Sequence, residues 1–240
     1  MNRSMEKRKN FATRLLHHNM ALVGGFLGGY AILLRSDFLG NAQTSNLIFI
    51  VMQFLDGNFF EMMLRIGAAM LYIFATIMYV FIKNKTNIRV KRLSILIDTI
   101  CIVILSFIPE NVNVVLALYP IFFAMSFQWN SFPGSEGYTS STIFSTNNLR
   151  QASLSFGEFL CDKDEKHLHK MFFFLGSLAG FHLGVFFSYF AVKMFRVQGV
   201  WFGLIPIITA CAINLWEEKM IEEYSEKINT NYSNLNCKSA

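Results

Sequence analysis

Long runs of residues without a charged side chain set the strongest limit on how this chain folds. Five such runs lie at 19–34, 66–82, 111–135, 171–192 and 197–216, and a sixth, 93–108, is interrupted only by Asp98. At about 1.5 Å of helix rise per residue, each run reaches or nearly reaches across a hydrocarbon core of roughly 30 Å. Since 53% of the residues are hydrophobic and only 15% are charged, the sequence predicts an all-α, polytopic membrane protein with six transmembrane helices.

Basic residues gather at one set of ends of these runs. The N-terminal segment holds five Lys and Arg residues, the loop 83–92 five, the segment 150–170 four and the tail after Trp216 three, whereas the opposite ends hold only Arg35, Arg65, Lys193 and Arg196. Because basic loops are retained in the cytoplasm, both termini are predicted to be cytoplasmic. The net charge of +5 is spread over loops in this arrangement, so we expect no nucleic-acid partner.

The order of the apolar runs repeats in the two halves of the chain. Thr44-Ser45-Asn46-Leu47 follows the first run, and Thr146-Asn147-Asn148-Leu149 follows the fourth. Each motif comes after a lead-in rich in Gly, Ser and Asn, at 36–43 and 131–145, and precedes an apolar segment too short to span, at 48–55 and 152–160. Three crossings per half would place the halves in opposite orientation. The pattern therefore predicts two inverted three-helix repeats with short broken or re-entrant helices.

This reading divides the chain into four parts. They are a basic cytoplasmic N-terminal segment at 1–18, a first three-span repeat at 19–110, a second three-span repeat at 111–216 and a cytoplasmic tail at 217–240.

The two polar breaks are the natural place for a site. Irregular backbone at membrane depth is stable only where protein or a water-filled cavity surrounds it. Thr44 and Thr146 are expected to be the N-cap residues of the two short helices. Free backbone amides at a helix start carry a partial positive charge and can hold a polar or anionic group.

Several motifs resemble one family in their order along the chain. They are Gly25-Phe26-Leu27-Gly28-Gly29-Tyr30, Gln43-Thr44-Ser45-Asn46, Ala124-Met125-Ser126-Phe127-Gln128 and Thr146-Asn147-Asn148-Leu149-Arg150. Together, over about residues 20–216, they resemble the YoaK-type family of bacterial membrane proteins, which is a domain of unknown function. The resemblance implies a multi-pass protein of the bacterial cytoplasmic membrane and leaves the substrate open.

The family pattern has glycine where this chain has Ser45 and Asn147, and tends to an acidic residue where this chain has Gly28. The polar positions that match it are Gln43, Thr44, Asn46, Gln128, Thr146 and Asn148. We expect these side chains to form the solute-binding site. Neutral amides and hydroxyls suit a hydrogen-bonding solute, or an ion held by carbonyl groups.

Asp98 is the candidate coupling residue, because a carboxylate inside a membrane span is costly and is usually retained for function. The alternatives are a structural pairing with a nearby Lys or Arg, or a side chain that reaches the interface. Among the other residues within the runs, Gly24, Gly25, Gly28 and Gly29 predict a helix that packs closely on a neighbour, and so do Gly176, Gly180 and Gly184. His182, beside the last of these, is expected to hydrogen-bond a neighbouring helix.

The leading hypothesis for function is transport of a small polar solute or ion by alternating access, with the halves rocking around the shared site. The alternative is a non-transporting membrane scaffold or sensor. No phosphate-binding loop, His-Glu-x-x-His or Gly-x-Ser-x-Gly motif is present, so an enzyme ranks third and no cofactor is expected. His17, His18, His167 and His169 lack further ligands at a suitable spacing, which argues against a metal site. The expected partners are the lipid bilayer and the unknown solute, and a homo-oligomer remains compatible with the sequence.

Overall fold

The structure is a computed structural model that describes residues 2–35, 41 and 43–236. Residues 36–40 and 42, most of the first polar lead-in, lie outside the described residues. The first half contains α1 (Asn2–Leu34), α2 (Gln43–Leu55), α3 (Phe59–Lys85) and α4 (Val90–Ser106). The second half contains α5 (Val114–Ala117), α6 (Tyr119–Ser131), β1 (Gly134–Ser135), β2 (Tyr138–Thr139), α7 (Thr146–Asp162), α8 (Glu165–Phe195), the 3₁₀ helix η1 (Arg196–Gly203) and α9 (Leu204–Asn236). The predicted all-α class is confirmed.

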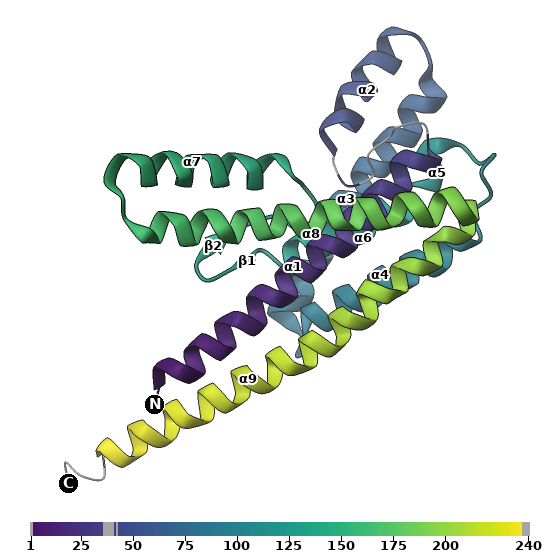
Figure 1. Ribbon diagram of the computed structural model, residues 1–240. Helices are drawn as coiled ribbons and strands as arrows, with labels where there is room; N and C mark the ends of the chain where they lie inside the picture. Colours follow the sequence, from purple (N-terminus) through teal and green to yellow (C-terminus); the bar gives the residue numbers. More distant parts are fainter. Residues whose placement is uncertain (1, 36–40, 42, 237–240) are drawn as a thin grey trace.

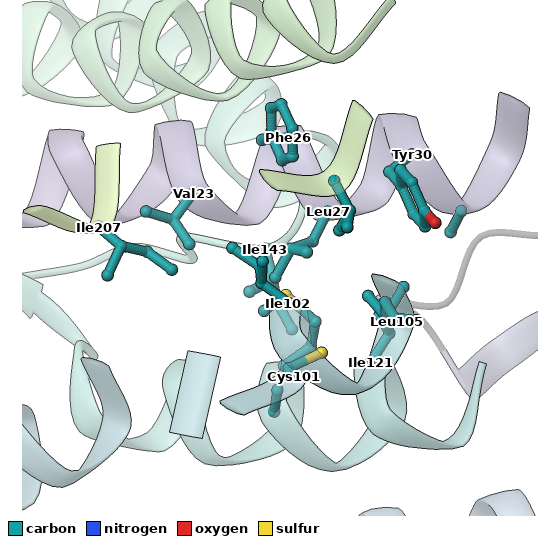
Figure 2. Close-up of a cluster of buried hydrophobic side chains, with 14 of the residues drawn as sticks. Val23, Phe26, Leu27, Tyr30, Cys101, Ile102, Leu105, Ile121, Ile143 and Ile207 are labelled. Carbon is teal, nitrogen blue, oxygen red and sulfur yellow. The ribbon is translucent and has the colours of Figure 1, made fainter. Parts of the chain in front are cut away.

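The helix α1 lies at the centre of this arrangement. It contacts α8 along one side and α9 along another, and it runs antiparallel to α9, so that the start of α1 and the end of α9 lie at the same end of the molecule (Figure 1). Its apolar side chains, including Val23, Phe26 and Leu27, pack against Ile102 of α4 and Ile207 of α9 in one buried cluster (Figure 2). Close packing of these side chains stabilises the contact between the helices.

The contacts of the first half are matched by those of the second. α1 contacts α8 and α9, and α6 contacts α3 and α4. α2 folds back on α3, as α7 folds back on α8. α4 and α9 contact each other. Exchanging α1 with α6, α2 with α7, α3 with α8 and α4 with α9 therefore leaves this set of contacts unchanged.

Four glycines give α1 two faces that allow close approach. A Cβ atom added at Gly25 would lie 1.9 Å from the carbonyl oxygen of Phe181, and one at Gly29 would lie 3.2 Å from Ser188 Cβ, so this pair faces α8. A Cβ atom at Gly24 would lie 2.3 Å from the carbonyl oxygen of Thr142, in the second polar break. Gly28 lies one turn after Gly24 on the same face.

The glycines of α8 complete this contact. A Cβ atom at Gly180 would lie 2.5 Å from the carbonyl oxygen of His18, and one at Gly184 would lie 2.1 Å from that of Leu22. The close helix packing predicted from both glycine series is confirmed, and the two series meet each other.

The fourth apolar run, 111–135, is not one helix. Asn113 caps the four-residue α5, accepting hydrogen bonds from the amides of Val115 and Leu116, and the helix restarts at α6 with Pro120 in its first turn. Proline lacks the amide hydrogen that a continuous helix would need at this position. The 13 residues of α6 rise about 20 Å, less than the roughly 30 Å of a hydrocarbon core.

Three smaller expectations are wrong. Thr44 is not an N-cap, because α2 already begins at Gln43, and α7 has Ser145 at its N-cap position in place of Thr146, without a side-chain capping bond. His182 is exposed and its Nδ1 lies 2.9 Å from the carbonyl oxygen of Leu178 in its own helix, so it does not bond a neighbour.

Two helical stretches of the described chain, 59–85 and 165–227, are long and apolar enough to cross a membrane. The second stretch includes α8, η1 and α9, and the chain turns back between α8 and α9 (Figure 1). These apolar helices agree with membrane association, whereas the six crossings and the cytoplasmic location of both termini stay predictions.

The glycine contacts predict the effect of adding one methyl group. Gly25→Ala should destabilise the fold by about 1–3 kcal/mol, because the new Cβ overlaps a backbone carbonyl that cannot move alone. Gly157→Ala is the matched control, since a Cβ there meets nothing within 4 Å, and alanine in a helix should stabilise by up to about 1 kcal/mol. Thermal unfolding of both variants in detergent, followed by circular dichroism, checks this. Equal unfolding temperatures for the two variants would contradict the packing.

Candidate functional site

Segment 140–143, in the second polar break, lies buried against α1. Each of its residues is at most 3% exposed, and its backbone is neither helix nor strand. Gln128 of α6 donates from Nε2 to the carbonyl oxygen of Met20 at 3.0 Å and to Thr142 Oγ1 at 2.9 Å. The Gln128 side chain therefore ties α6 to α1 and to the break.

Asn148, in the first turn of α7, shapes this segment. Its Oδ1 accepts from Ser140 Oγ at 2.9 Å and from the Ser141 amide at 3.3 Å, and its Nδ2 donates to the carbonyl oxygens of Ser141 and Phe144 at 2.7 and 3.2 Å. Both donors and both lone pairs of the amide are then in use. Asn148 thus fixes the loop, and a solute could reach its amide only by replacing one of these bonds.

Ser140 extends the network into two long helices. Its Oγ, whose one hydrogen goes to Asn148, lies 2.9 Å from His17 Nε2 on α1 and 3.2 Å from Ser177 Oγ on α8. All three side chains are at most 2% exposed. The segment is therefore held on α1 and α8 by polar contacts as well as by packing.

Asn41 brings the first polar break to the second. Its fully buried side chain donates from Nδ2 to the carbonyl oxygen of Gly24 at 2.9 Å and to that of Ile143 at 3.3 Å. Gly28 makes room for it, since a Cβ there would lie 2.7 Å from Asn41 Nδ2. The two breaks meet on the face of α1 formed by Gly24 and Gly28.

We call this buried group the polar seam; it consists of Asn41, Gln128, Ser140, Thr142 and Asn148. The carbonyl partners of Asn41 and Gln128 can only accept hydrogen bonds, which fixes the orientation of both amides. Their remaining oxygens, Asn41 Oδ1 and Gln128 Oε1, are buried and have no hydrogen-bond partner among the described residues. Because buried polar atoms are nearly always paired, these two acceptors mark a place suited to a donor.

The predicted binding residues are only partly brought together. Gln128 and Asn148 lie in the polar seam, while Asn46 donates from Nδ2 to Gln43 Oε1 and to the carbonyl oxygen of Arg65, both at 2.9 Å, and so belongs to a separate contact between α2 and α3. Thr44 and Thr146 are exposed. The predicted set therefore does not form one cluster.

Four residues of the site were not predicted from sequence: Asn41, Ser140, Thr142 and, at its margin, His17. Asn41 had a signal, because it lies in a polar stretch between two apolar runs. The other three had none, since their burial depends on which way the second break folds over α1.

Asp98 of α4 is fully buried, and neither carboxylate oxygen has a hydrogen-bond partner in the described part of the chain. Ser94, one turn earlier on the same face, is also buried, and its hydroxyl is likewise without a partner among described residues. The expected alternatives, pairing with Lys or Arg and reaching the interface, are not observed. An unpaired buried carboxylate is stable only when it carries a proton or binds a cation.

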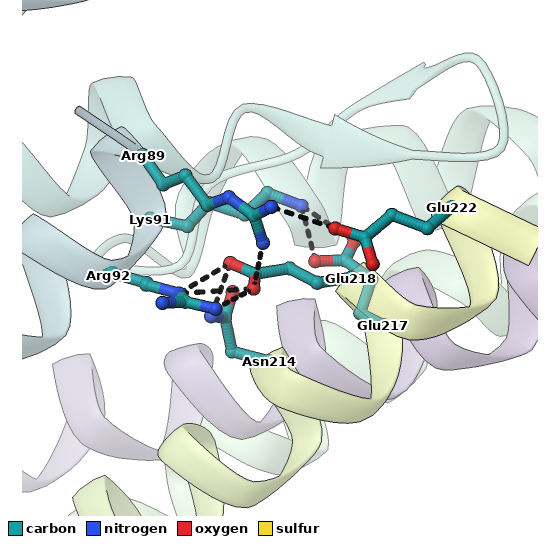
Figure 3. Close-up of polar contacts among 7 residues, drawn as sticks. All are labelled: Arg89, Lys91, Arg92, Asn214, Glu217, Glu218 and Glu222. Atoms are coloured by element: carbon teal, nitrogen blue, oxygen red, sulfur yellow. Dashed lines mark hydrogen bonds and ion pairs between the residues drawn. The ribbon is translucent and has the colours of Figure 1, made fainter. Parts of the chain in front are cut away.

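An ion-pair cluster joins α4 to α9 at the basic end of α4 (Figure 3). Lys91 Nζ lies 2.6 Å from Glu217 Oε1, and Arg92 Nε lies 2.9 Å from Glu218 Oε1. Arg89 contacts Glu218 and lies 2.8 Å from Glu222 Oε1. The hydrogen bonds that Arg89 donates to Glu222 and Glu218 raise the pKa of its guanidinium group. We call these six residues the ionic cluster; together with Asn214, a neighbour that donates to Glu218, they are the residues drawn in Figure 3.

Two glutamates of the ionic cluster differ in burial, and this difference predicts unequal effects of their substitution on stability. The Glu217 side chain is 1% exposed and that of Glu222 is 60% exposed. Glu217→Gln should cost about 1–3 kcal/mol, because it weakens charge-assisted bonds that a buried carboxylate accepts from Lys91. Glu222→Gln should cost no more than about 1 kcal/mol. Thermal unfolding at low and high salt measures both, and similar losses from the two substitutions would argue against a buried Lys91–Glu217 pair.

Comparison with known proteins supplies a family and no activity. No curated protein and no solved structure matches the chain. Residues 16–213 match the family model described as "Protein of unknown function (DUF1275)". The matched range includes the glycine faces of α1, both polar breaks and Asp98, and the match is consistent with the YoaK-type resemblance. The chain is a member of the DUF1275 family.

Proposed function

We propose that the protein is a polytopic membrane transporter, in which two inverted halves rock around the polar seam and move a small polar solute or ion. The observation that carries this proposal is the contact of Asn41, from the first polar break, with the buried segment 140–143 of the second, on one glycine face of a central helix. In the hydrocarbon region, irregular backbone is tolerated where it is enclosed by protein or lines a polar cavity. Transporters built from inverted repeats place their sites at such breaks.

The matching contacts of the two halves support the inverted repeat. When α1–α4 are exchanged with α6–α9, each contact between long helices in one half has a counterpart in the other. The same is true of the short helices α2 and α7, which fold back on α3 and α8, and the contact between α4 and α9 is its own counterpart. Two related halves offer two related arrangements of similar free energy. This is the requirement for a site that opens alternately to either side.

The unpaired atoms of the polar seam favour one type of solute. Asn41 Oδ1 and Gln128 Oε1 both accept hydrogen bonds, and neither has a partner among the described residues. A solute with N–H or O–H donors, or a cation, would use them, whereas an anion would be repelled. We therefore propose a hydrogen-bond donor or a cation as the transported solute.

Asp98 is the proposed coupling residue. Its unpaired carboxylate is buried in α4, a helix that contacts both α6 and α9. Movement of α4 relative to α9 would expose the carboxylate to water, where it can lose a proton or a bound cation. The same movement would have to separate the ionic cluster, which holds the basic end of α4 against the glutamates of α9. We assign that end to the cytoplasm from the distribution of basic residues.

The far end of α4 is held by another contact. The guanidinium group of Arg35, which is 1% exposed, donates to the carbonyl oxygens of Pro109 and Glu110 at 3.0 and 3.1 Å, and to that of Ile108 at 3.2 Å. These carbonyls follow α4, where helical bonding ends. Both ends of α4 thus carry polar closures that an alternating-access movement would open in turn.

A non-transporting scaffold or sensor is the second candidate. The glycine series of α8 is covered by α1, so a partner protein would need another face. α2 offers one, because Leu47, Val51 and Leu55 are each more than half exposed. In the transporter proposal, lipid covers this face.

The transport proposal is tested first by finding the solute. A thermal-shift screen of the purified protein against cationic and donor-rich metabolites should reveal one compound that raises the unfolding temperature, since a ligand of the native state stabilises it. Gln128→Leu should reduce that affinity by about tenfold or more, through loss of a buried hydrogen bond. Thr44→Val is the control and should leave the affinity unchanged, because Thr44 is exposed. Equal loss in both variants would remove the polar seam as the site.

Coupling is tested in proteoliposomes that contain the identified solute. Asp98→Asn should abolish solute-driven proton movement and keep solute binding, because asparagine cannot exchange a proton. The outcome that counts against Asp98 is unchanged proton movement in a variant that remains folded.

A further inference from the structure

A cavity lies between α3 and α6, away from the polar seam. Its volume is about 500 Å³, within the range of small-molecule sites. α3 contributes Tyr72, Thr76, Tyr79 and Lys83 to its walls, and α6 contributes Trp129 and Asn130.

The repeat of the fold explains why a cavity forms here. The contact between α3 and α6 is the counterpart of the contact between α8 and α1, which glycines close to backbone distance. Toward the end of α3 that carries Lys83, the bulky side chains of Tyr72, Tyr79 and Trp129 line the space between the two helices. The contact between α1 and α8 is thus closed by glycines, whereas the corresponding contact between α6 and α3 leaves a cavity.

Hydrogen bonds fix the frame of this cavity. Ser126 Oγ of α6 donates to the carbonyl oxygen of Tyr72 at 2.9 Å and lies 2.9 Å from Thr76 Oγ1. Gln128, two residues later, bonds α1 instead. The cavity and the polar seam therefore use different faces of α6, and a ligand in one does not occupy the other.

The charge of the lining selects the ligand. Lys83 is the single charged residue among the described residues that line the cavity, and its Nζ lies 5.6 Å from the ring centroid of Tyr79. No carboxylate lines this part of the described chain. Thr76 Oγ1 donates to the carbonyl oxygen of Tyr72, and one hydrogen of Asn130 Nδ2 goes to that of Ser126. The Thr139 hydroxyl and the second Nδ2 hydrogen of Asn130 are the neutral donors of the lining, while the aromatic rings offer an apolar wall.

We propose that this cavity binds an amphipathic organic anion, with a carboxylate or phosphate group at Lys83 and an apolar body between Tyr72, Tyr79 and Trp129. The proposal goes beyond the transport function, because the ligand has the opposite charge preference from that proposed for the polar seam. A lipid headgroup and a free metabolite share this chemistry. Trp129 is 40% exposed, so the cavity is open to either source.

Trp129 provides the reporter for the test. A Trp201→Phe/Trp216→Phe variant, purified in a non-ionic detergent, leaves Trp129 as the only tryptophan. Octanoate should change its fluorescence with a saturable dependence on concentration, and octylammonium should not. In the same background Lys83→Met should weaken octanoate binding by about tenfold, Lys83→Arg should largely restore it, and Lys85→Met, outside the lining, should change it less than twofold.

The result that overturns the proposal is a non-saturable response, an equal response to octylammonium, or equal weakening by Lys83→Met and Lys85→Met. Nanodiscs separate the two sources of ligand. If a lipid headgroup occupies the cavity, phosphatidylglycerol in place of phosphatidylcholine raises the apparent Kd for octanoate in the parent and not in Lys83→Met. If a free anion is the ligand, the lipid exchange changes both variants alike. Neither readout depends on transport, so failure of the transport proposal leaves this test intact.

Discussion

Close approach of backbone to α1 is the constraint on which the remaining structure depends. Gly25 and Gly29 admit the backbone of α8, while Gly24 and Gly28, one position earlier in each case, admit the two polar breaks. A side chain at any of these positions would push a neighbouring segment outward. Without that approach, Asn41 could not reach the carbonyl oxygens of Gly24 and Ile143 together, and the two breaks would not meet. One helix with two glycine faces therefore supports both the bundle and the candidate site.

Polar groups placed by this packing divide into two kinds. Asn148 and Ser140 use their hydrogen-bonding capacity within the protein, and so they define the shape of the second break. Asn41, Gln128 and Asp98 keep buried oxygens that are unpaired within the described residues. An unpaired buried polar atom is costly, so a water, a solute or, for Asp98, a proton would lower the free energy at these oxygens. This contrast separates residues that build the site from residues that would act in it.

Sequence patterns predicted the parts of the structure that depend on local chemistry. The helical class followed from the apolar runs, and the close packing at Gly25 and Gly184 followed from glycine spacing. The burial of Gln128, Asn148 and Asp98 agrees with their positions inside or beside apolar segments. Thr44 and Thr146 lie exposed, outside the polar seam, because a shared motif predicts equivalent positions in two repeats and does not predict which side chains turn inward.

Features that depend on long-range folding were missed. Ser140 and Thr142 lie in a polar loop, and a loop sequence does not reveal that α1 will cover it. The break between α5 and α6 depends on the cap at Asn113 and on Pro120, within a run that periodicity alone reads as continuous. Family membership covers most of the chain and adds no activity. The proposed function therefore rests on the chemistry of the polar seam, and the access of water to the polar seam would decide between a transporter and a dry scaffold.

Alternating access around the polar seam is tested most directly by measuring whether water reaches the polar seam from both membrane faces. A variant with Thr142→Cys as its single cysteine would be placed in oriented vesicles and treated with a membrane-impermeant maleimide from one side or the other. The account predicts labelling from each side, with the solute protecting the cysteine. Labelling from neither side, or from one side alone, in a folded protein would contradict alternating access around the polar seam.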